Sequence, residues 1–238
     1  MSNDAVKKAD AGAPQLPLLA PRFRVLLVDL PGHGRSALPP GRLTVEAMAA
    51  RVEALLDELG EGRVHVVGIS LGACVGLALA LRAPARVRSL TLVNGFAQLR
   101  PPDAAGALRM AVRLVLLATA PMTAVARLVA ASMFPAPEQA ALRASAVRSL
   151  ARTSRRAYLK AIAALAAFDA RARLGEIRCP TLVVAGLDDR TVALEAKEAL
   201  AHGIPGARLV LVPGSGHATP VDRANAFNGV LHEFLAGS

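Results

Sequence analysis

The strongest constraint on the fold of this chain is the pentapeptide GISLG at residues 68–72, because the sequence changes character on either side of it. The preceding residues, 63–69, form a short apolar run rich in β-branched side chains, which is typical of a buried parallel strand. The following residues, 71–82, have the pattern of a helix that ends before Pro84. A serine between glycines at such a junction indicates a sharp turn that exposes the Ser70 hydroxyl at the edge of a sheet.

Strand-like and helix-like segments alternate towards both ends of the chain. Four further apolar runs resemble buried strands, at residues 24–30, 88–93, 181–185 and 208–212. Further helical patterns lie between or after them, at residues 45–59, 191–201 and 220–235. Thr44 can cap the first of these helices. The alternation predicts an α/β fold with a doubly wound parallel sheet, covered by helices on both faces and joined by right-handed crossovers.

The middle of the chain breaks this alternation. Residues 98–173 contain no strand-like run, are rich in alanine, leucine and arginine, and are interrupted by several prolines. This pattern predicts helices inserted between two strands of the sheet. We therefore expect a core formed by residues 1–97 and 174–238, and a helical cap formed by residues 98–173.

Composition narrows the class of protein. The chain has 238 residues, of which 53% are hydrophobic and 19% charged, so it can bury a large core. It contains no uninterrupted run of about 20 apolar residues, so no membrane span is expected. Residues 1–12 are polar and lack the apolar region of a secretory signal, which favours a cytoplasmic protein. Its two cysteines, Cys74 and Cys179, are then expected to be free, buried thiols.

Most of the net charge of +10 falls within the predicted cap, where residues 100–173 contain twelve basic and three acidic side chains. A nucleic acid is not the expected partner, because aromatic residues make up only 3% and no zinc or RNA-binding signature is present. The basic cap could attract an anionic group of a substrate or an acidic carrier protein. Alternatively, these side chains are solvated helix surface in an arginine-rich chain.

A serine hydroxyl needs a histidine base and an orienting carboxylate to act as a nucleophile near neutral pH. Of the five histidines, His217 follows the last strand-like run on a glycine-rich loop, at the edge where active sites of parallel sheets gather. Asp188 and Asp189 follow the strand-like run 181–185 and reach the same edge, so either could be the carboxylate. This chemistry needs neither a metal nor an organic cofactor.

Four motifs together resemble the α/β-hydrolase family, over the chain from about Pro14 to its C-terminus. They are DLPGHGRS at residues 29–36, the pentapeptide, GLDD at residues 186–189, and the pair Gly216-His217. The order serine, aspartate, histidine is also that of this family. The resemblance implies a capped serine esterase, similar to enol-lactonases and to methyl esterases that act on a pimeloyl carrier. It also implies that Asp189 is the acid and that Asp188 is a turn or helix-cap residue.

The resemblance assigns a role to each candidate residue. Ser70 attacks the carbonyl of a small-molecule ester, lactone or thioester, or a carbonyl next to a carbon–carbon bond, and the Leu71 N–H contacts the resulting oxyanion. His217 takes and returns the proton, while Asp189 orients the imidazole. The wall of the pocket is expected to include Gly32, His33, Ile69, Asn94 and Phe96.

One segment of the family is missing. Its members carry a strand ending in His-Gly between the strands that correspond to residues 24–30 and 63–69, and the loop after it donates a second oxyanion N–H. The His-Gly pairs of this chain, at residues 33–34 and 202–203, lie elsewhere. We therefore expect either a sequence that starts late or two strands that pair directly across the gap. The alternative function is that of a catalytically impaired homologue that acts, if at all, by binding.

Overall fold

The computed structural model describes residues 13–99 and 104–237 of the chain. The polar stretch 1–12 and the first residues of the basic middle segment, 100–103, lie outside the described residues. Four strands form one parallel sheet in the order β1-β2-β3-β4. They are β1 (Val64–Ile69), β2 (Val87–Val93), β3 (Thr181–Gly186) and β4 (Arg208–Val212). The predicted α/β class with a parallel sheet is confirmed, as are four of the five predicted strands.

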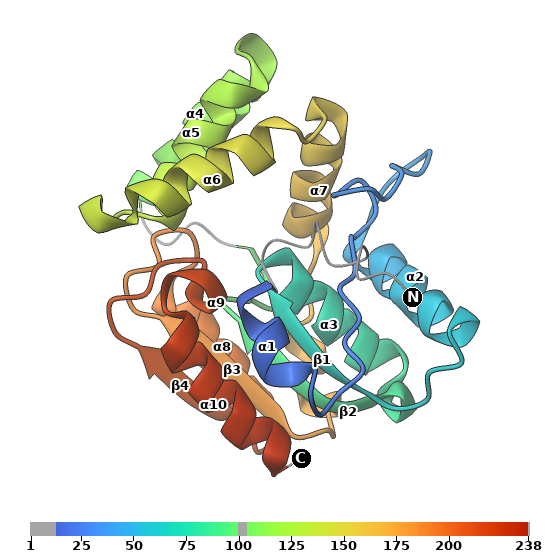
Figure 1. Cartoon of the computed structure of the whole chain (residues 1–238). Coiled ribbons are helices and arrows are strands. Elements are labelled where there is room, and N and C mark those ends of the chain that lie inside the picture. The colour runs from blue at the N-terminus through green and yellow to red at the C-terminus, as the bar shows by residue number, and fades with distance from the viewer. Residues whose placement is uncertain (1–12, 100–103, 238) are drawn as a thin grey trace.

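Helices cover both faces of this sheet (Figure 1). One face packs against α2 (Val45–Glu58), α3 (Leu71–Arg82) and α8 (Leu194–Gly203). The other packs against α1 (Leu16–Leu19) and α10 (Ala224–Ala236), which α9 (Thr219–Asp222) precedes. Strand β3 is buried at every position. Its alternate side chains enter the two clusters, since Val183 belongs to one and Leu182 and Val184 to the other.

Local signals in the sequence account for where several of these elements begin and end. The Thr44 hydroxyl accepts a hydrogen bond of 3.0 Å from the Ala47 N–H and caps α2, as predicted. Helix α3 starts directly after Ser70 and stops at Arg82, two residues before Pro84. Both cysteines are free and buried, as the composition predicts.

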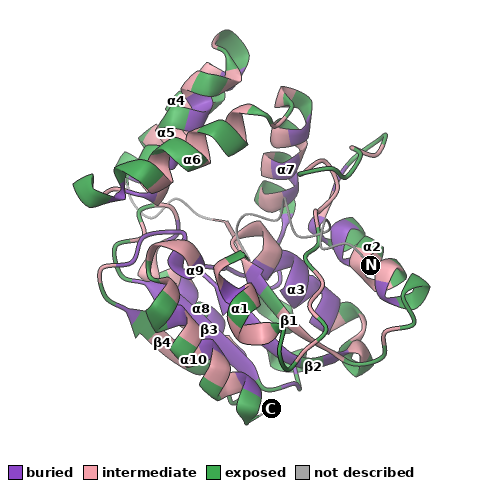
Figure 2. Ribbon diagram, in the orientation of Figure 1, coloured by how far each residue is buried: buried purple, intermediate pink, exposed green. Residues whose placement is uncertain are grey.

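Between β2 and β3 the described residues form four α-helices, and we refer to these as the cap. They are α4 (Ala104–Thr119), α5 (Met122–Met133), α6 (Ala140–Ala151) and α7 (Arg155–Ala167). Figure 1 shows the cap above the sheet, at the end where Ser70 follows β1. Much of its surface is exposed (Figure 2). Helix α7 joins the cap to the core, because the Lys160 ammonium donates to the Pro39 carbonyl at 2.9 Å. No helix of the described residues is long and apolar enough to cross a membrane.

The prediction of a strand at residues 24–30 is wrong. This segment has no regular secondary structure, and β1 pairs with β2 alone among the described residues. The segment nevertheless starts beside β1, because the rings of Phe23 and His65 meet edge to face with centroids 5.5 Å apart. The expectation that the two segments pair directly is therefore also wrong. Within residues 13–99 and 104–237 no strand pairs with the other edge of β1, which we call the open edge, and Val67 on that strand is 43% exposed.

Candidate active site

Ser70 occupies a strained turn between β1 and α3. Its backbone has φ 52° and ψ −115°, a conformation that a residue other than glycine rarely adopts. The preceding glycine makes this turn possible, since a Cβ on Gly68 would lie 2.2 Å from the Gly72 carbonyl oxygen. The Leu71 N–H is the first of α3 and has no acceptor within the helix, so it is available to an anion near Ser70.

His217 and Asp189 meet at the carboxyl edge of the sheet. The His217 Nδ1 lies 2.9 Å from Asp189 Oδ2, and both residues lie on loops that directly follow strands. Asp188, by contrast, is exposed. A carboxylate against Nδ1 fixes the orientation and the tautomer of the ring, which leaves Nε2 to exchange protons. No hydrogen bond joins Ser70 to His217 among the described residues, and such bonds are often long until a substrate is bound.

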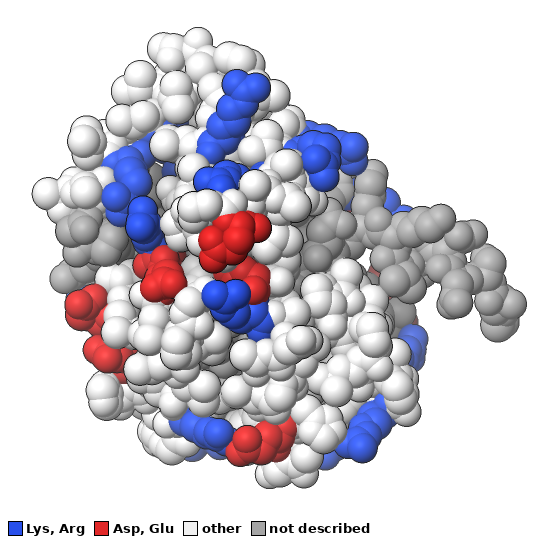
Figure 3. Space-filling model, turned by 60° about the vertical axis from the view of Figure 1, so that its left-hand side comes forward, with Lys and Arg blue, Asp and Glu red and all other residues white. Residues whose placement is uncertain are grey.

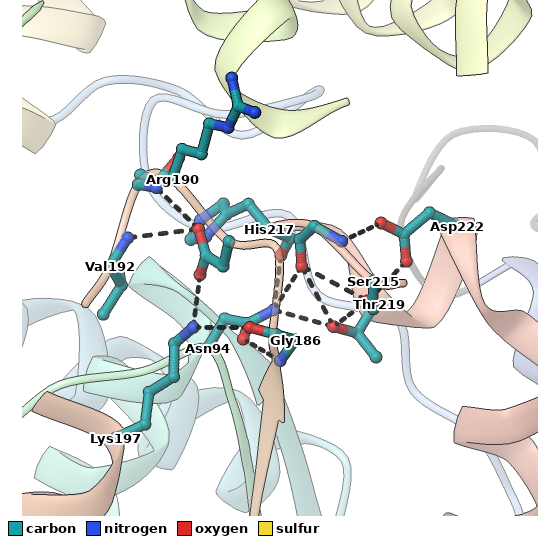
Figure 4. Close-up of polar contacts among 12 residues, drawn as sticks. Asn94, Gly186, Arg190, Val192, Lys197, Ser215, His217, Thr219 and Asp222 are labelled. Atoms are coloured by element: carbon teal, nitrogen blue, oxygen red, sulfur yellow. Dashed lines mark hydrogen bonds and ion pairs between the residues drawn. The ribbon is translucent and has the colours of Figure 1, made fainter. Parts of the chain in front are cut away.

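Asp189 is held as a carboxylate by polar partners at both of its oxygens, and Figure 4 labels three of these partners, Val192, Lys197 and His217. Its Oδ1 accepts hydrogen bonds from the Thr191 and Val192 N–H groups, and its Oδ2 lies 2.9 Å from Lys197 Nζ. Burial is the largest influence and opposes ionisation, but His217 and Lys197 outweigh it and lower the pKa of Asp189 to about 2. Asp189 is therefore ionised throughout the neutral range.

Lys197 is a residue of the candidate site that the sequence analysis did not identify. Its side chain is 1% exposed, and its ammonium also donates to the Gly186 carbonyl at 3.2 Å. Burial lowers the pKa of Lys197, and the neighbouring Asp189 acts in the opposite direction. A buried lysine is stable only when paired in this way.

Asn94 holds the loop of His217 in place (Figure 4). Its side-chain amide donates to the His217 carbonyl at 2.9 Å, and its Oδ1 accepts from the Gly186 N–H at 2.9 Å. Asn94 is fully buried and has φ 46°, a left-handed conformation that asparagine tolerates better than most residues. The far side of the loop is tied down by Asp222, which accepts from the Gly216 N–H at 2.7 Å.

A cavity of about 100 Å³ opens beside Ser70. Its wall comes from the cap, from the segment after β2 and from the loop at residues 190–192. Of the residues predicted to form the pocket wall, Phe96 lines this cavity, whereas Gly32, His33, Ile69 and Asn94 do not.

Each of these four residues has another place in the fold. Gly32 packs against Leu38 and against Ala157 of α7, and Ile69 packs into the cluster beneath α10. The ring of His33 lies 3.2 Å from the Pro31 carbonyl oxygen, within its own turn. The turn at residues 31–34 therefore supports the cap from below.

Basic side chains predominate among the charged residues of the cap. In Figure 3 the upper part of the molecule, which holds the cap, shows lysine and arginine side chains, while the acidic ones lie in its middle and lower parts. No cluster of three or more His, Cys, Asp or Glu side chains that could hold a metal occurs in the part of the chain that the structure describes.

Comparison with known proteins places this site in a family. Residues 10–224 match the family model described as the alpha/beta hydrolase fold. A protein of Azorhizobium caulinodans that carries the name carbamate hydrolase RutD is 37% identical over 229 residues, which cover 93% of this chain and 84% of that protein. The enol-lactonase structure from Burkholderia xenovorans is 31% identical, with a TM-score of 0.87 over 96% of this chain and 86% of that one. A thermophilic esterase from Thermogutta terrifontis is 26% identical, with a TM-score of 0.82 over 96% and 85% of the two chains. The chain belongs to the α/β-hydrolase fold family.

Proposed function

We propose that this hydrolase cleaves carboxylic esters or lactones of small molecules through an acyl-enzyme, with Ser70, His217 and Asp189 as its catalytic residues. The observation that carries the proposal is the 2.9 Å contact between His217 Nδ1 and the buried Asp189 carboxylate, on the same sheet edge as the strained Ser70. The similarity to an enol-lactonase and an esterase supports this choice of substrates. The carbamate hydrolase relative adds carbamates, which also have an acyl carbonyl and a leaving group.

The geometry supports a two-step reaction. The Ser70 Oγ attacks the acyl carbonyl while His217 Nε2 takes its proton, and the Leu71 N–H stabilises the tetrahedral oxyanion. Collapse of this intermediate breaks the bond to the alcohol oxygen, which receives the proton from His217. Water then attacks the acyl-serine with His217 again as the base, and the acid product leaves with Ser70 restored.

Fluorophosphonate labelling and turnover of p-nitrophenyl acetate test this proposal. We expect the wild-type protein to gain the mass of one probe and to release p-nitrophenol, and Ser70→Ala to do neither. Ser132 provides a matched control, because it is a second serine on the wall of the same cavity. Ser132→Ala should still be labelled. Turnover that survives unchanged in Ser70→Ala would exclude Ser70 as the nucleophile.

A second candidate function is binding without turnover. It is favoured by the open edge of β1, where members of the family have a further strand. The loop after that strand carries the second oxyanion donor, and neither has a counterpart among the described residues. Loss of one such donor lowers turnover by about 10²- to 10³-fold. Wild-type protein that is folded and monodisperse but resists the fluorophosphonate would favour this candidate over catalysis.

A further inference from the structure

Three arginines share the wall of the cavity with Ser70. Arg109 and Arg113 come from α4, and Arg190 comes from the loop directly after Asp189. The described lining contains no aspartate or glutamate. We propose that these arginines bind a carboxylate, so that the preferred substrate is a small ester or lactone that also carries a free carboxylate. The inference rests on the proposed function, because it names the class of ester that the same cavity accepts.

Two polar atoms of the wall lack a partner within the described residues. The Arg113 Nε and the Thr191 hydroxyl are buried and make no hydrogen bond. Buried donors are nearly always paired in folded proteins, and exceptions call for an explanation. Both residues belong to the wall of the cavity, so two side chains of this wall have hydrogen-bonding capacity that the described residues do not use.

Arg109 and Arg190 are brought together by a direct contact. The Arg109 guanidinium donates to the Arg190 carbonyl at 3.2 Å, so α4 is joined to the loop that holds Asp189. The side chain of Arg190 is exposed and points towards the cap (Figure 4). Asp189 pairs with Lys197 and His217, so the charge of this carboxylate is balanced within the core. Guanidinium groups gathered on one wall attract an anion and repel each other less once it is bound.

The size of the cavity and the shape of the guanidinium group favour a small carboxylate. The volume of this cavity, about 100 Å³, is well below the roughly 300–1,000 Å³ of pockets that hold drug-sized ligands. The planar guanidinium donates in parallel to both oxygens of a carboxylate, which adds geometric selection to charge. Apolar side chains from Met110, Ile162 and Leu165 complete the wall and leave space for a short carbon chain.

A pair of esters that differ only in charge tests the inference. Monomethyl succinate carries a carboxylate where methyl succinamate carries a neutral amide of nearly the same shape. We expect wild-type kcat/KM to favour the acid by at least about tenfold, as for a hydrogen bond to a charged group in a desolvated site. Arg113→Gln should reduce this ratio to less than about threefold, chiefly by raising KM for the acid. Arg190→Gln, at an exposed position that cannot disturb the core, should reduce it in the same direction.

Arg148→Gln is the matched control, because Arg148 is an exposed arginine of the cap, on α6, outside the cavity wall. It removes the same charge from the cap and should leave the ratio unchanged. Equal turnover of the two esters by wild type, or a ratio that neither cavity variant alters, would overturn the inference while leaving the proposed function intact.

Titration calorimetry of succinate binding to the Ser70→Ala variant tests the anion site without turnover. We expect succinate to bind to this variant. Adding Arg113→Gln should weaken the binding about tenfold, whereas adding Arg148→Gln should leave it unchanged. Succinate binding together with failure of both esters and of labelling would reject the proposed function but retain the anion site. No succinate binding in Ser70→Ala would reject the anion site.

Discussion

Lys197 and Asp189 form an ion pair inside the protein, with Nζ 2.9 Å from Oδ2 and side chains that are 1% and 0% exposed. The same Oδ2 accepts the hydrogen bond of His217. One carboxylate oxygen therefore serves both a cation of the core and the proposed catalytic imidazole. Stability and the proposed chemistry are therefore coupled at this atom.

Replacing Lys197 with methionine should lower the free energy of unfolding by about 3–5 kcal/mol, because it leaves the buried Asp189 charge without its cation. Urea denaturation at neutral pH measures this loss. Lys160→Met is the control, since it removes a lysine that donates to one carbonyl oxygen, and should lower stability by about 1 kcal/mol. Equal losses in the two variants would contradict a structural role for the buried pair.

Acid should weaken the fold through Asp189. Its pKa is about 2 in the folded protein, below the ordinary value of 3.8, so the unfolded chain takes up this proton first as the pH falls. The contribution to the free energy of unfolding, on the order of 2 kcal/mol, is complete above about pH 5, falls steeply between about pH 4 and 2, and is gone by about pH 1. Urea denaturation at pH 5, 4, 3 and 2 follows it. Asp189→Asn should lack this part of the pH dependence. If its free energy of unfolding fell with pH as steeply as that of the wild type, the acid sensitivity would not come from Asp189.

The two glycines of the pentapeptide should respond to alanine in opposite directions. A Cβ at Gly68 would lie 2.2 Å from the Gly72 carbonyl oxygen, whereas a Cβ at Gly72 meets nothing within 4 Å. Gly68→Ala should therefore lower the free energy of unfolding by about 1–3 kcal/mol or more. The same variant should also lose fluorophosphonate labelling, because the turn that exposes Ser70 is disturbed. Gly72→Ala lies inside α3 and should gain roughly 0.5–1 kcal/mol. Thermal unfolding compares the two, and the same shift in both would show that the turn differs from the one described.

Ser70 should limit the stability of the fold through its backbone. Because its φ of 52° strains any residue with a Cβ, Ser70→Gly should be more stable than Ser70→Ala by about 1 kcal/mol. Both variants lack the hydroxyl and should be inert towards the fluorophosphonate. Denaturant unfolding of the two proteins measures the difference, which would vanish if the turn relaxed in the absence of the serine.

The open edge of β1 should promote association between molecules, because unpaired strand groups beside an exposed valine can pair with another chain. Light scattering at increasing protein concentration should detect this association. Val67→Lys should suppress it, since a charged side chain on an edge strand opposes pairing. Leu59→Lys is the control, because Leu59 is similarly exposed, at 38% against 43%, but lies at the end of α2. Equal suppression by both variants would point to general solubility and not to the strand edge.

The sequence predicted those strands that have a local signal. Its prediction failed for residues 24–30, because a strand also needs a neighbouring strand to pair with. Buried parallel strands are apolar along their whole length, so β3 and its neighbours stand out in a single sequence. Residues 24–30 have the same composition, but a strand exists only when a neighbouring strand accepts its hydrogen bonds. Composition reports the propensity of a segment, and pairing is a property of the whole fold.

Prediction of the site had the same limit. Ser70, Asp189 and His217 lie at strand ends beside glycines, which marks them in the sequence. Lys197 lies among glutamates and alanines of a helix that reads as solvated, and its burial arises only when α8 packs against β3. Asn94 was predicted to line the pocket. It faces into the protein, because its amide pairs with backbone groups of two other segments.

The reactive groups are anchored chiefly in the sheet. Asn94 and Asp222 bind the loop of His217 from the core, while the described cap reaches that loop with one backbone hydrogen bond, to Met133. The cap can therefore diverge in sequence with little effect on the position of the imidazole. Exchange of α4–α7 for the equivalent helices of a relative should transfer substrate preference while keeping the reaction, which makes this chain a suitable recipient for grafted specificity.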